Sequence, residues 1–291
     1  MPSRVSEGDL MLVSGQELLA WAVANKCAVA SFNTYNLETT RAFIQAAETT
    51  QKPIFLALGS GALAYGDFAT LVALTKVAAE TAKVAVALHI DHGESPEVIE
   101  RCFQAGFTSF MFDGSHLSLE DNIRLTREAK DRVGAYPLEA ELGGVGGDED
   151  AAGSQASDIP MTDPREAARL ADETGVDSLA IAIGNAHGLY KGKPKLDFTR
   201  LEQIHHAVNI PLVLHGASGI PDEDITTAIT HGVRKINVNT EIRGRFFATL
   251  QEQLPETSKS LNLIGLMSPA IEAMAQAAQE KMTLFASCVR A

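Results

Sequence analysis

Eight short apolar segments alternate along this chain with longer amphipathic segments, and this alternation limits the fold more than any other feature. The apolar segments are rich in valine, isoleucine, leucine and alanine without regular polar alternation, which is typical of strands buried on both faces. We predict strands at Ala28–Phe32, Pro53–Leu58, Val84–Ile90, Ser109–Phe112, Tyr136–Glu141, Ser178–Ile183, Pro211–Leu214 and Lys235–Val238. Strands that alternate with helices in this way favour a parallel sheet.

Helix signals fill most of the intervals between these strands. The predicted helices are Leu37–Thr50, Ser95–Ala105, Leu119–Arg132, Asp163–Thr174, Phe198–Val208 and Asp222–Thr230. Ser95 is a favoured N-terminal cap, and Pro96 occupies the first helical position, where its missing N–H is tolerated. A further amphipathic helix is predicted at Ser268–Ser287, packed either on the rest of the fold or on a second subunit.

A closed (β/α)8 TIM barrel is the most economical fold for eight strand–helix repeats in 291 residues. We therefore predict one barrel domain spanning residues 1–291, with an additional C-terminal helix at about 268–287. An open, doubly wound sheet is the alternative that periodicity leaves open. The first predicted strand is not followed by a GxGxxG motif, which disfavours dinucleotide binding.

Charge and cysteine content narrow the environment and the partners of the chain. Lysine and arginine number 24 against 37 aspartates and glutamates, and the resulting net charge of −13 disfavours nucleic acid as a partner. Three widely separated cysteines, Cys27, Cys102 and Cys288, provide neither a disulfide framework nor a CxxC metal motif. The apolar stretches are far shorter than the ~20 residues that span a bilayer, and the N-terminus lacks the apolar region of a secretory signal. We therefore expect a cytoplasmic protein with no membrane partner.

Three histidines follow three different predicted strands, and each precedes a glycine: His92, His187 and His215. Functional groups of such a barrel gather where strands end and loops begin, so a closed fold would bring these side chains together. Three neutral imidazoles with an open fourth position are typical of a catalytic zinc site. A single histidine of this kind is more often a polar loop residue, but three at equivalent strand ends favour a metal.

Carboxylates accompany the histidines. Strict strand alternation would turn Asp91 and His92 to opposite faces, so they converge only if the backbone bends where the strand ends. With that bend, Asp91 is suited to proton transfer at a metal-bound substrate; the alternative is that it caps the next helix. Glu139 and Glu141 face the same side of the fifth strand, where a carboxylate is costly unless it is paired or near a cation. We interpret both, together with His89, as groups that support the metal site, and Glu141 also as an alternative metal ligand.

Four glycines within residues 143–147 precede three acidic residues, the second of which is Glu149. Such a segment can act as a hinge, and its closure would deliver the Glu149 carboxylate to the substrate. An exposed acidic loop is the alternative interpretation.

An anion site is predicted from two segments that follow the last two strands. Gly216–Gly219 (GASG) and Asn237–Thr240 (NVNT) offer backbone N–H groups, hydroxyls and a helix N-terminus. This is the usual phosphate position of a TIM barrel. Lys191 and Arg243 would add positive charge there.

Taken together, these motifs resemble the class II, metal-dependent fructose/tagatose-bisphosphate aldolase family. The matching segments occur in order over nearly the whole chain: SFNTYNLE, LHIDHGES, MFDGSH, EAELGGVGG, IGNAHGLYKG, PLVLHGASGIP and KINVNTEIR. The resemblance implies a (β/α)8 barrel that reversibly cleaves a ketose 1,6-bisphosphate to dihydroxyacetone phosphate and an aldehyde. Fructose 1,6-bisphosphate, which yields glyceraldehyde 3-phosphate, is the expected substrate. Tagatose 1,6-bisphosphate or another phosphorylated ketose is the alternative, because the family carries different residues at the position of Asn239.

The resemblance also implies roles for individual residues. One zinc ion per subunit would lie on His92, His187 and His215, with Glu141 beside it. Asp91 would act as acid and base at the C4 hydroxyl, and Glu149 would move the proton on the dihydroxyacetone phosphate carbon. The groups implied in binding the substrate and its phosphates are Gly188, Lys191, Gly216, Ser218, Asn237, Asn239, Thr240 and Arg243. We also expect a monovalent cation, Na⁺ or K⁺, and a homodimer or homotetramer.

Three other functions compete with this interpretation. A metal-dependent sugar-phosphate isomerase or epimerase would use the same groups but retain the carbon count of its substrate. A Schiff-base aldolase needs a buried lysine on a strand; the sixth predicted strand has none, and Lys235 begins the eighth at the end away from the site. A non-catalytic sugar-phosphate or metal-binding protein would have no use for Asp91 and Glu149.

Overall fold

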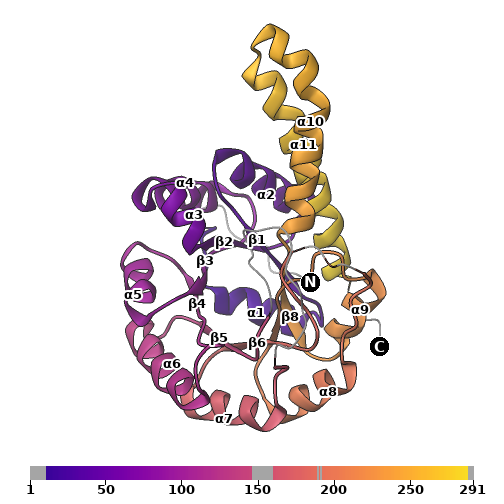
Figure 1. Ribbon diagram of the computed structural model, residues 1–291. Coiled ribbons are helices and arrows are strands. Elements are labelled where there is room, and N and C mark those ends of the chain that lie inside the picture. The colour runs from indigo at the N-terminus through magenta and orange to yellow at the C-terminus, as the bar shows by residue number, and fades with distance from the viewer. Residues whose placement is uncertain (1–10, 146–159, 189, 191, 288–291) are drawn as a thin grey trace.

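The computed structural model describes residues 11–145, 160–188, 190 and 192–287. Eight parallel strands pair in chain order, and β8 pairs with β1, so the sheet closes into a barrel (Figure 1). The strands are β1 (Val29–Asn33), β2 (Ile54–Gly59), β3 (Val86–Gly93), β4 (Ser109–Phe112), β5 (Leu138–Leu142), β6 (Ser178–Ile181), β7 (Leu212–Leu214) and β8 (Val233–Asn237). The predicted TIM barrel is therefore confirmed, and the open sheet is excluded.

Most of the helices surround the barrel on its outside (Figure 1). In chain order, the helices are α1 (Gly15–Ala24), α2 (Leu37–Thr50), α3 (Ser60–Tyr65), α4 (Phe68–Thr81), α5 (Pro96–Gln104), α6 (Leu119–Val133), α7 (Pro164–Thr174), α8 (Phe198–Ala207), α9 (Asp222–Thr230), α10 (Thr240–Ser260) and α11 (Leu263–Phe285). The predicted C-terminal helix is confirmed as α11, but it begins five residues earlier than expected. The Asn262 side chain caps it by accepting the Gly265 N–H at 2.9 Å, and Pro269 lies within the helix.

Helix α1, which the sequence did not predict, lies across the amino end of the barrel. Its cap, Ser14, and Glu17 form a capping box that fixes where the helix begins. Leu18 and Leu19 pack with Phe55 of β2 and neighbouring strand residues. The amino end is therefore closed by apolar packing, and the opposite end is left for polar groups.

Successive residues of a barrel strand point alternately to the helices and to the interior. In β5, Leu138, Ala140 and Leu142 belong to the apolar core between sheet and helices. Glu139 and Glu141 lie between them and are also buried. The predicted shared orientation of these two glutamates agrees with the structure.

Helices α10 and α11 form a hairpin that projects beyond the barrel (Figure 1). Toward the C-terminus, buried residues of α11 such as Ile271 and Met274 join the main core. At the far end of the hairpin, large apolar side chains are exposed: Leu261 retains 89% and Ile264 retains 78% of its accessible surface.

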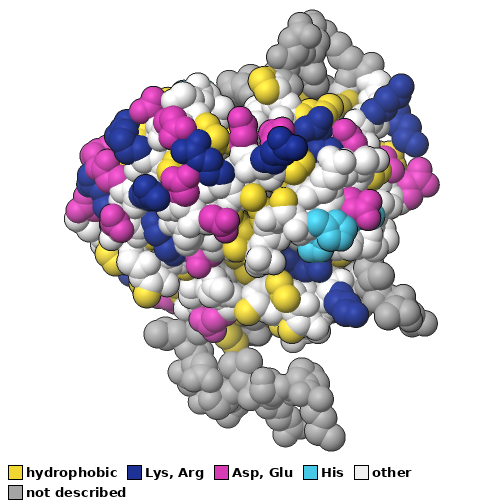
Figure 2. All heavy atoms as spheres, turned by 90° about the horizontal axis from the view of Figure 1, so that it is seen from below, with side chains coloured by type: hydrophobic (Ala, Val, Ile, Leu, Met, Phe, Trp, Pro, Cys, Tyr) yellow, Lys and Arg dark blue, Asp and Glu magenta, His cyan; other side chains and the backbone are white. Residues whose placement is uncertain are grey.

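The face drawn in Figure 2 carries lysine, arginine, aspartate and glutamate side chains interspersed with small apolar areas. Charges of one sign do not gather there into a continuous patch. Within the described residues, no helix combines the length and apolar character that crossing a bilayer requires.

Candidate active site

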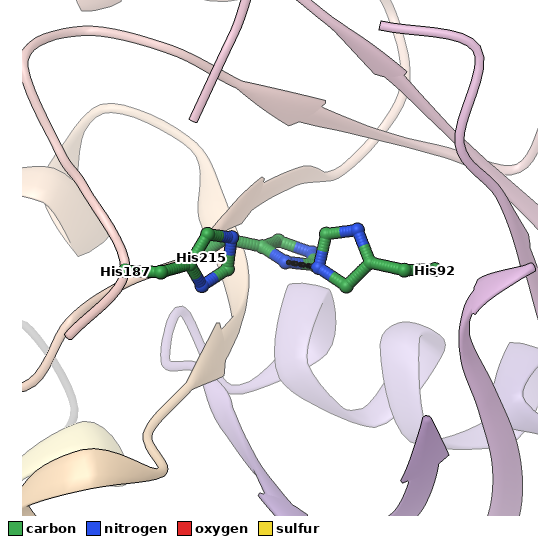
Figure 3. A group of neighbouring side chains, drawn as sticks. All are labelled: His92, His187 and His215. Atoms are coloured by element: carbon green, nitrogen blue, oxygen red, sulfur yellow. Dashed lines mark hydrogen bonds between the residues drawn. The ribbon is translucent and has the colours of Figure 1, made fainter. Parts of the chain in front are cut away.

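The three strand-end histidines converge at the carboxyl end of the barrel. His92 lies in β3, and His187 and His215 follow β6 and β7. Figure 3 shows their imidazole rings pointing toward one another, with His215 Nδ1 3.1 Å from His92 Nε2. One nitrogen of each ring lies within 4.8 Å of the others, close enough for all three to share a metal ion.

A bend in β3 brings His92 and the preceding Asp91 to the same side. The register with β4 shifts between Ile90 and Gly93, and His92 has a φ of 49°, in the left-handed region. Such a conformation is strained for a residue other than glycine and is characteristic of functional sites. The alternative role of Asp91 as a helix cap is excluded, because the Ser95 side chain caps α5.

Asp91 is fully buried, and both of its carboxylate oxygens accept hydrogen bonds. The Asn33 amide donates to Oδ2 at 2.8 Å, and the Asn237 amide donates to Oδ1 at 3.1 Å. Burial opposes ionisation, but His92, His215 and other nearby basic groups outweigh it and hold the Asp91 pKa well below its usual range. The structure therefore presents an oriented carboxylate, which is the form that a general base requires.

His92 also contacts a carboxylate that the sequence analysis did not single out. Its Nδ1 lies 2.8 Å from Asp113 Oδ2, at the end of β4. This hydrogen bond and the charge of His92 overcome burial and lower the pKa of Asp113. A carboxylate on one imidazole nitrogen fixes the tautomer and directs the other nitrogen to a metal. The available signal in the sequence was the acidic residue that directly follows strand four, within MFDGSH.

Glu141 lies beside this pair, with Oε2 3.9 Å from His92 Nδ1. Burial and the nearby Asp113 raise the pKa of Glu141 to about 8. Its Oε2 is buried and has no hydrogen-bond partner among the described residues. His92, Asp113 and Glu141 form a second group whose ligand atoms are close enough to hold a metal ion.

Glu139 forms a hydrogen bond with His215, and Lys235 forms an ion pair with Glu139. His215 Nε2 lies 2.8 Å from Glu139 Oε1, and Lys235 Nζ donates to Glu139 Oε2, also at 2.8 Å. The expectation for Lys235 was wrong: β8 begins at Val233, and Lys235 lies at its centre with a side chain 1% exposed inside the barrel. Strand eight starts two residues earlier than its apolar pattern suggested, and this places Lys235 at the centre of the strand instead of at its start.

The environment disfavours the protonated form of two of the three histidines, His187 and His215. Burial, together with the charges of His92 and His215, lowers the pKa of His187 to about 3. Burial also lowers the pKa of His215, although Glu139 opposes that shift. Unprotonated imidazole is the form that binds divalent metals, so the donor set fits a metal ion such as zinc.

The predicted anion-binding segments lie together beside the histidines. Gly216 has a φ of 62°, and a Cβ there would lie 2.3 Å from the Ala186 carbonyl oxygen, so glycine is needed for this close approach. The Tyr190 hydroxyl accepts the Ala186 N–H at 2.8 Å and donates to the Gly216 carbonyl at 2.9 Å, which joins the loops after β6 and β7. Ser218 Oγ accepts the Glu241 N–H at 3.1 Å and so lies against the first turn of α10.

Tyr35 connects two other predicted binding residues. Its hydroxyl accepts hydrogen bonds from the Asn239 amide at 2.6 Å and from Arg243 Nη1 at 3.3 Å. The Arg243 guanidinium also lies over the Tyr35 ring, 5.6 Å from its centroid. Asn239 precedes α10 but forms no side-chain cap, because its amide is turned toward this tyrosine. Tyr35 was not predicted as a site residue, since nothing in the local sequence links residue 35 to residues 239 and 243.

The remaining predicted site residues have different outcomes. Asn237 lies inside the barrel against Asp91, and Thr240 begins α10 next to the anion-binding segments. Gly188 follows His187 with a φ of 87°. His89 lies deeper than the three histidines, where its Nε2 is 3.1 Å from Lys235 Nζ. Two further predicted residues lie outside the described part of the chain, namely Glu149 and Lys191.

Comparisons with known proteins agree with this arrangement. A family model described as class-II fructose-bisphosphate aldolase matches residues 13–290. A fructose-bisphosphate aldolase of Thermus caldophilus is 40% identical, and the alignment covers 97% of this chain and 100% of the relative. One from Geobacillus stearothermophilus is also 40% identical, with 97% and 99% covered. Among solved structures, the YdjI aldolase of Escherichia coli K12 matches with a TM-score of 0.85 and 36% identity, over 95% of this chain and 98% of that one.

Proposed function

Because this chain belongs to the class-II fructose-bisphosphate aldolase family and is a metal-dependent carbon–carbon lyase, we propose that its substrate is fructose 1,6-bisphosphate and its metal is zinc. The products are dihydroxyacetone phosphate and glyceraldehyde 3-phosphate. The observation that carries the proposal is the convergence of three imidazoles beside Asp91 at the carboxyl end of the barrel. The names of the two curated relatives support the choice of sugar.

His92, His187 and His215 hold the zinc ion, and Glu141 is an alternative ligand. His92 Nδ1 faces the Asp113 carboxylate and donates its proton there, so in the neutral imidazole the lone pair lies on Nε2, toward His215. Two ring nitrogens that face each other suit a shared cation, and Glu141 Oε2, which has no hydrogen-bond partner among the described residues, lies nearby. A bound zinc ion would polarise the substrate carbonyl and stabilise the negative charge that develops when the carbon–carbon bond breaks.

Asp91 is the group that removes the proton from the C4 hydroxyl. The Asn33 and Asn237 amides occupy one lone pair on each carboxylate oxygen and orient the group without neutralising it. As the hydroxyl proton passes to Asp91, the oxygen becomes the aldehyde carbonyl and the C3–C4 bond breaks. Glu149 returns a proton to C3 of the dihydroxyacetone phosphate half, a role that comes from the family resemblance.

The phosphates bind on either side of this centre. Backbone N–H groups of the Gly188 and Gly216 loops, with Ser218 and Thr240, hold the first phosphate at the start of α10, and Lys191 adds charge. Arg243, held by Tyr35, meets the second phosphate. Asn237 and Asn239 contact the part of the sugar between them.

The test is cleavage of fructose 1,6-bisphosphate, with tagatose 1,6-bisphosphate alongside, before and after EDTA treatment and zinc addition. We expect dihydroxyacetone phosphate to be released from fructose 1,6-bisphosphate, to stop with EDTA and to return with zinc. A faster rate with tagatose 1,6-bisphosphate would identify that sugar as the substrate, while the proposed cleavage reaction would stand. Conversion with retained carbon count would instead support an isomerase or epimerase.

A Schiff-base mechanism is tested in the same assay by adding borohydride with substrate. The lysine inside the barrel is bound to Glu139 and His89, an arrangement that holds it as an ammonium donor rather than as a nucleophile. We therefore expect no borohydride inactivation. Covalent trapping of the substrate on Lys235 would refute the metal mechanism.

We also propose a homodimer or homotetramer that covers the far end of the α10–α11 hairpin. Leu261, Leu263 and Ile264 are all at least 65% exposed there, and exposed apolar groups of this size are characteristic of protein–protein contacts. Ultracentrifugation of the wild type and of a Leu261→Ser/Ile264→Ser variant tests this: the variant should dissociate to a lower mass. A monomeric wild type would contradict it.

Three further proposals concern the setting of the enzyme. The chain forms one barrel domain, which a single cooperative unfolding transition would support. It works in the cytoplasm, in keeping with Cys27 and Cys102, which are buried thiols.

Cleavage depends on Na⁺ or K⁺, which is tested by comparing rates in either salt with rates in choline chloride.

A further inference from the structure

A continuous chain of buried polar groups runs beneath the three histidines. Ser109 Oγ lies 2.9 Å from His89 Nδ1, and His89 Nε2 lies 3.1 Å from Lys235 Nζ. Lys235 continues to Glu139, and Glu139 to His215, each at 2.8 Å. All five residues are at most 4% exposed, so water cannot replace any of these partners.

The chemistry of the groups fixes where each proton lies. A lysine ammonium donates and cannot accept, so Lys235 makes His89 Nε2 an acceptor and places the His89 proton on Nδ1, facing Ser109. The Glu139 carboxylate accepts at both oxygens, from Lys235 at Oε2 and from His215 Nε2 at Oε1. The His215 proton therefore lies on Nε2, and the Nδ1 lone pair faces His92 and His187.

The charge on Lys235 is what keeps this arrangement in place. A buried carboxylate is strongly disfavoured unless a cation and hydrogen-bond donors compensate it. Lys235 Nζ also lies 5.5 Å from the centroid of the Phe55 ring, which offers the ammonium a further favourable contact. The ammonium thus has a carboxylate, an imidazole nitrogen and an aromatic face around it.

We propose that Lys235 is a positioning residue of the metal site: through Glu139 it holds the His215 proton on Nε2 and keeps Nδ1 available to the metal. This inference rests on the proposed metal site. Lys235 contacts the Glu139 oxygen that does not face His215. It would therefore touch neither the metal nor the substrate.

The first experiment measures zinc affinity by competition with a chelating indicator in the wild type and in Lys235→Met. We expect the variant to bind zinc about 10–100-fold more weakly, the usual effect of losing a partner that orients a ligand. Lys130→Met is the matched control. Lys130 forms a 2.6 Å ion pair with Asp177, which precedes β6 at the opposite end of the barrel from the histidines. That variant should lose thermal stability and keep its zinc affinity.

A second variant separates positioning from stability. Lys235→Met alone leaves a buried carboxylate unpaired and lowers the melting temperature. Lys235→Met/Glu139→Leu removes the charge and the acceptor together, so the melting temperature should recover while zinc affinity stays low. Wild-type zinc affinity in the double variant would overturn the proposal, because the ion pair would then serve stability alone.

Nitrogen NMR of the metal-free protein tests the tautomer directly, with His215 assigned by comparison with His215→Gln. We expect His215 to be protonated on Nε2 in the wild type and to shift toward Nδ1 protonation in Lys235→Met. Protonation on Nδ1 in the wild type would overturn the proposal. If the wild type binds no zinc, the proposed metal centre fails, and the tautomer measurement still decides whether Lys235 controls His215.

Discussion

The two faces of strands β5 and β8 differ sharply, although residues of the two faces alternate along each strand. On β8, Ile236 packs into the apolar core beneath the helices, whereas Lys235 and Asn237 on either side of it point inward. On β5, Leu138 and Ala140 face the helices in the same way, with Glu139 between them. Both faces are buried to a similar degree, so burial alone does not distinguish them.

What differs is how each face is stabilised. The outer face gains from removing apolar surface from water, a non-directional effect that tolerates many combinations of residues. On the inner face a buried charge is costly, and it persists only because a specific partner compensates it. Changes on the outer face should therefore reduce stability, and changes on the inner face should reduce metal binding or the chemical step.

The largest expected effect is that of Asp91→Ala on the inner face. Loss of a general base typically lowers the rate ~10²–10⁴-fold, so we expect kcat/KM for fructose 1,6-bisphosphate to fall by that factor while zinc stoichiometry is unchanged. Asp91→Asn is the matched control, because it keeps the shape of the side chain but removes the base. Near-normal turnover in Asp91→Ala would contradict the role of the residue and weaken the distinction between the faces.

The second largest effect is that of Leu138→Ala on the outer face. Truncating a fully buried leucine costs about 2–5 kcal/mol of unfolding free energy, because it loses apolar burial and leaves a cavity. Urea unfolding measures this loss, and kcat/KM per folded molecule should stay close to the wild-type value. Leu138→Met, which nearly conserves volume, should cost less than about 1.5 kcal/mol. A Leu138→Ala variant with wild-type unfolding free energy but a reduced kcat/KM would contradict this prediction.

The outer face was the part that the sequence could predict. Its apolar residues recur within each strand and helix, so local patterns were enough to place all eight strands and most of the helices that cover them. The predicted ends of β4 match the structure and the other strand ends differ by at most three residues, because the pairing of neighbouring strands decides where each strand begins and ends. Helix α1 was missed because its role, closing the amino end of the barrel, depends on contacts with several distant strands.

The inner face was predictable only where a residue type already signals its chemistry. His92, His187 and His215 could be grouped because each follows a strand and precedes a glycine. Glu139 was expected to support this site, but the histidine that it contacts was not predictable, and neither were the roles of Asp113 and Lys235, because these contacts cross the barrel between different strands. The sequence indicated that Asp91 and His92 converge only if the backbone bends. The register of β3 with β4 shows where this bend lies.

Acid dependence of stability gives the third test, with a smaller expected effect. Burial opposes ionisation of Glu139, but Lys235 and His215 outweigh it and lower its pKa from the usual 4.5 to about 2. Between these pH values the unfolded chain binds a proton at Glu139 that the folded protein does not, so stability falls as the pH falls through this window.

Urea unfolding of the metal-free protein at a series of pH values measures this dependence. The Lys235→Met/Glu139→Leu variant is the comparison, since it lacks both members of the pair. We expect its unfolding free energy to change less steeply below the usual Glu139 pKa. Equal steepness in the two proteins would show that the inner pair contributes nothing to acid sensitivity.

The smallest expected effect is that of Arg169→Met. This substitution removes a solvent-exposed ion pair that lies outside the sheet. Arg169 contacts both oxygens of Glu120, at 2.6 and 2.8 Å, and its Nε donates to Glu173 at 2.6 Å. This geometry is as good as that of Lys235 with Glu139, yet Arg169 is 41% exposed. Water and salt screen exposed charges, and such pairs contribute roughly 0–1 kcal/mol. We therefore expect Arg169→Met to change the unfolding free energy by less than about 1 kcal/mol, and this difference to shrink further at high salt. A loss as large as that of Lys235→Met would mean that geometry, and not burial, makes the inner pair important.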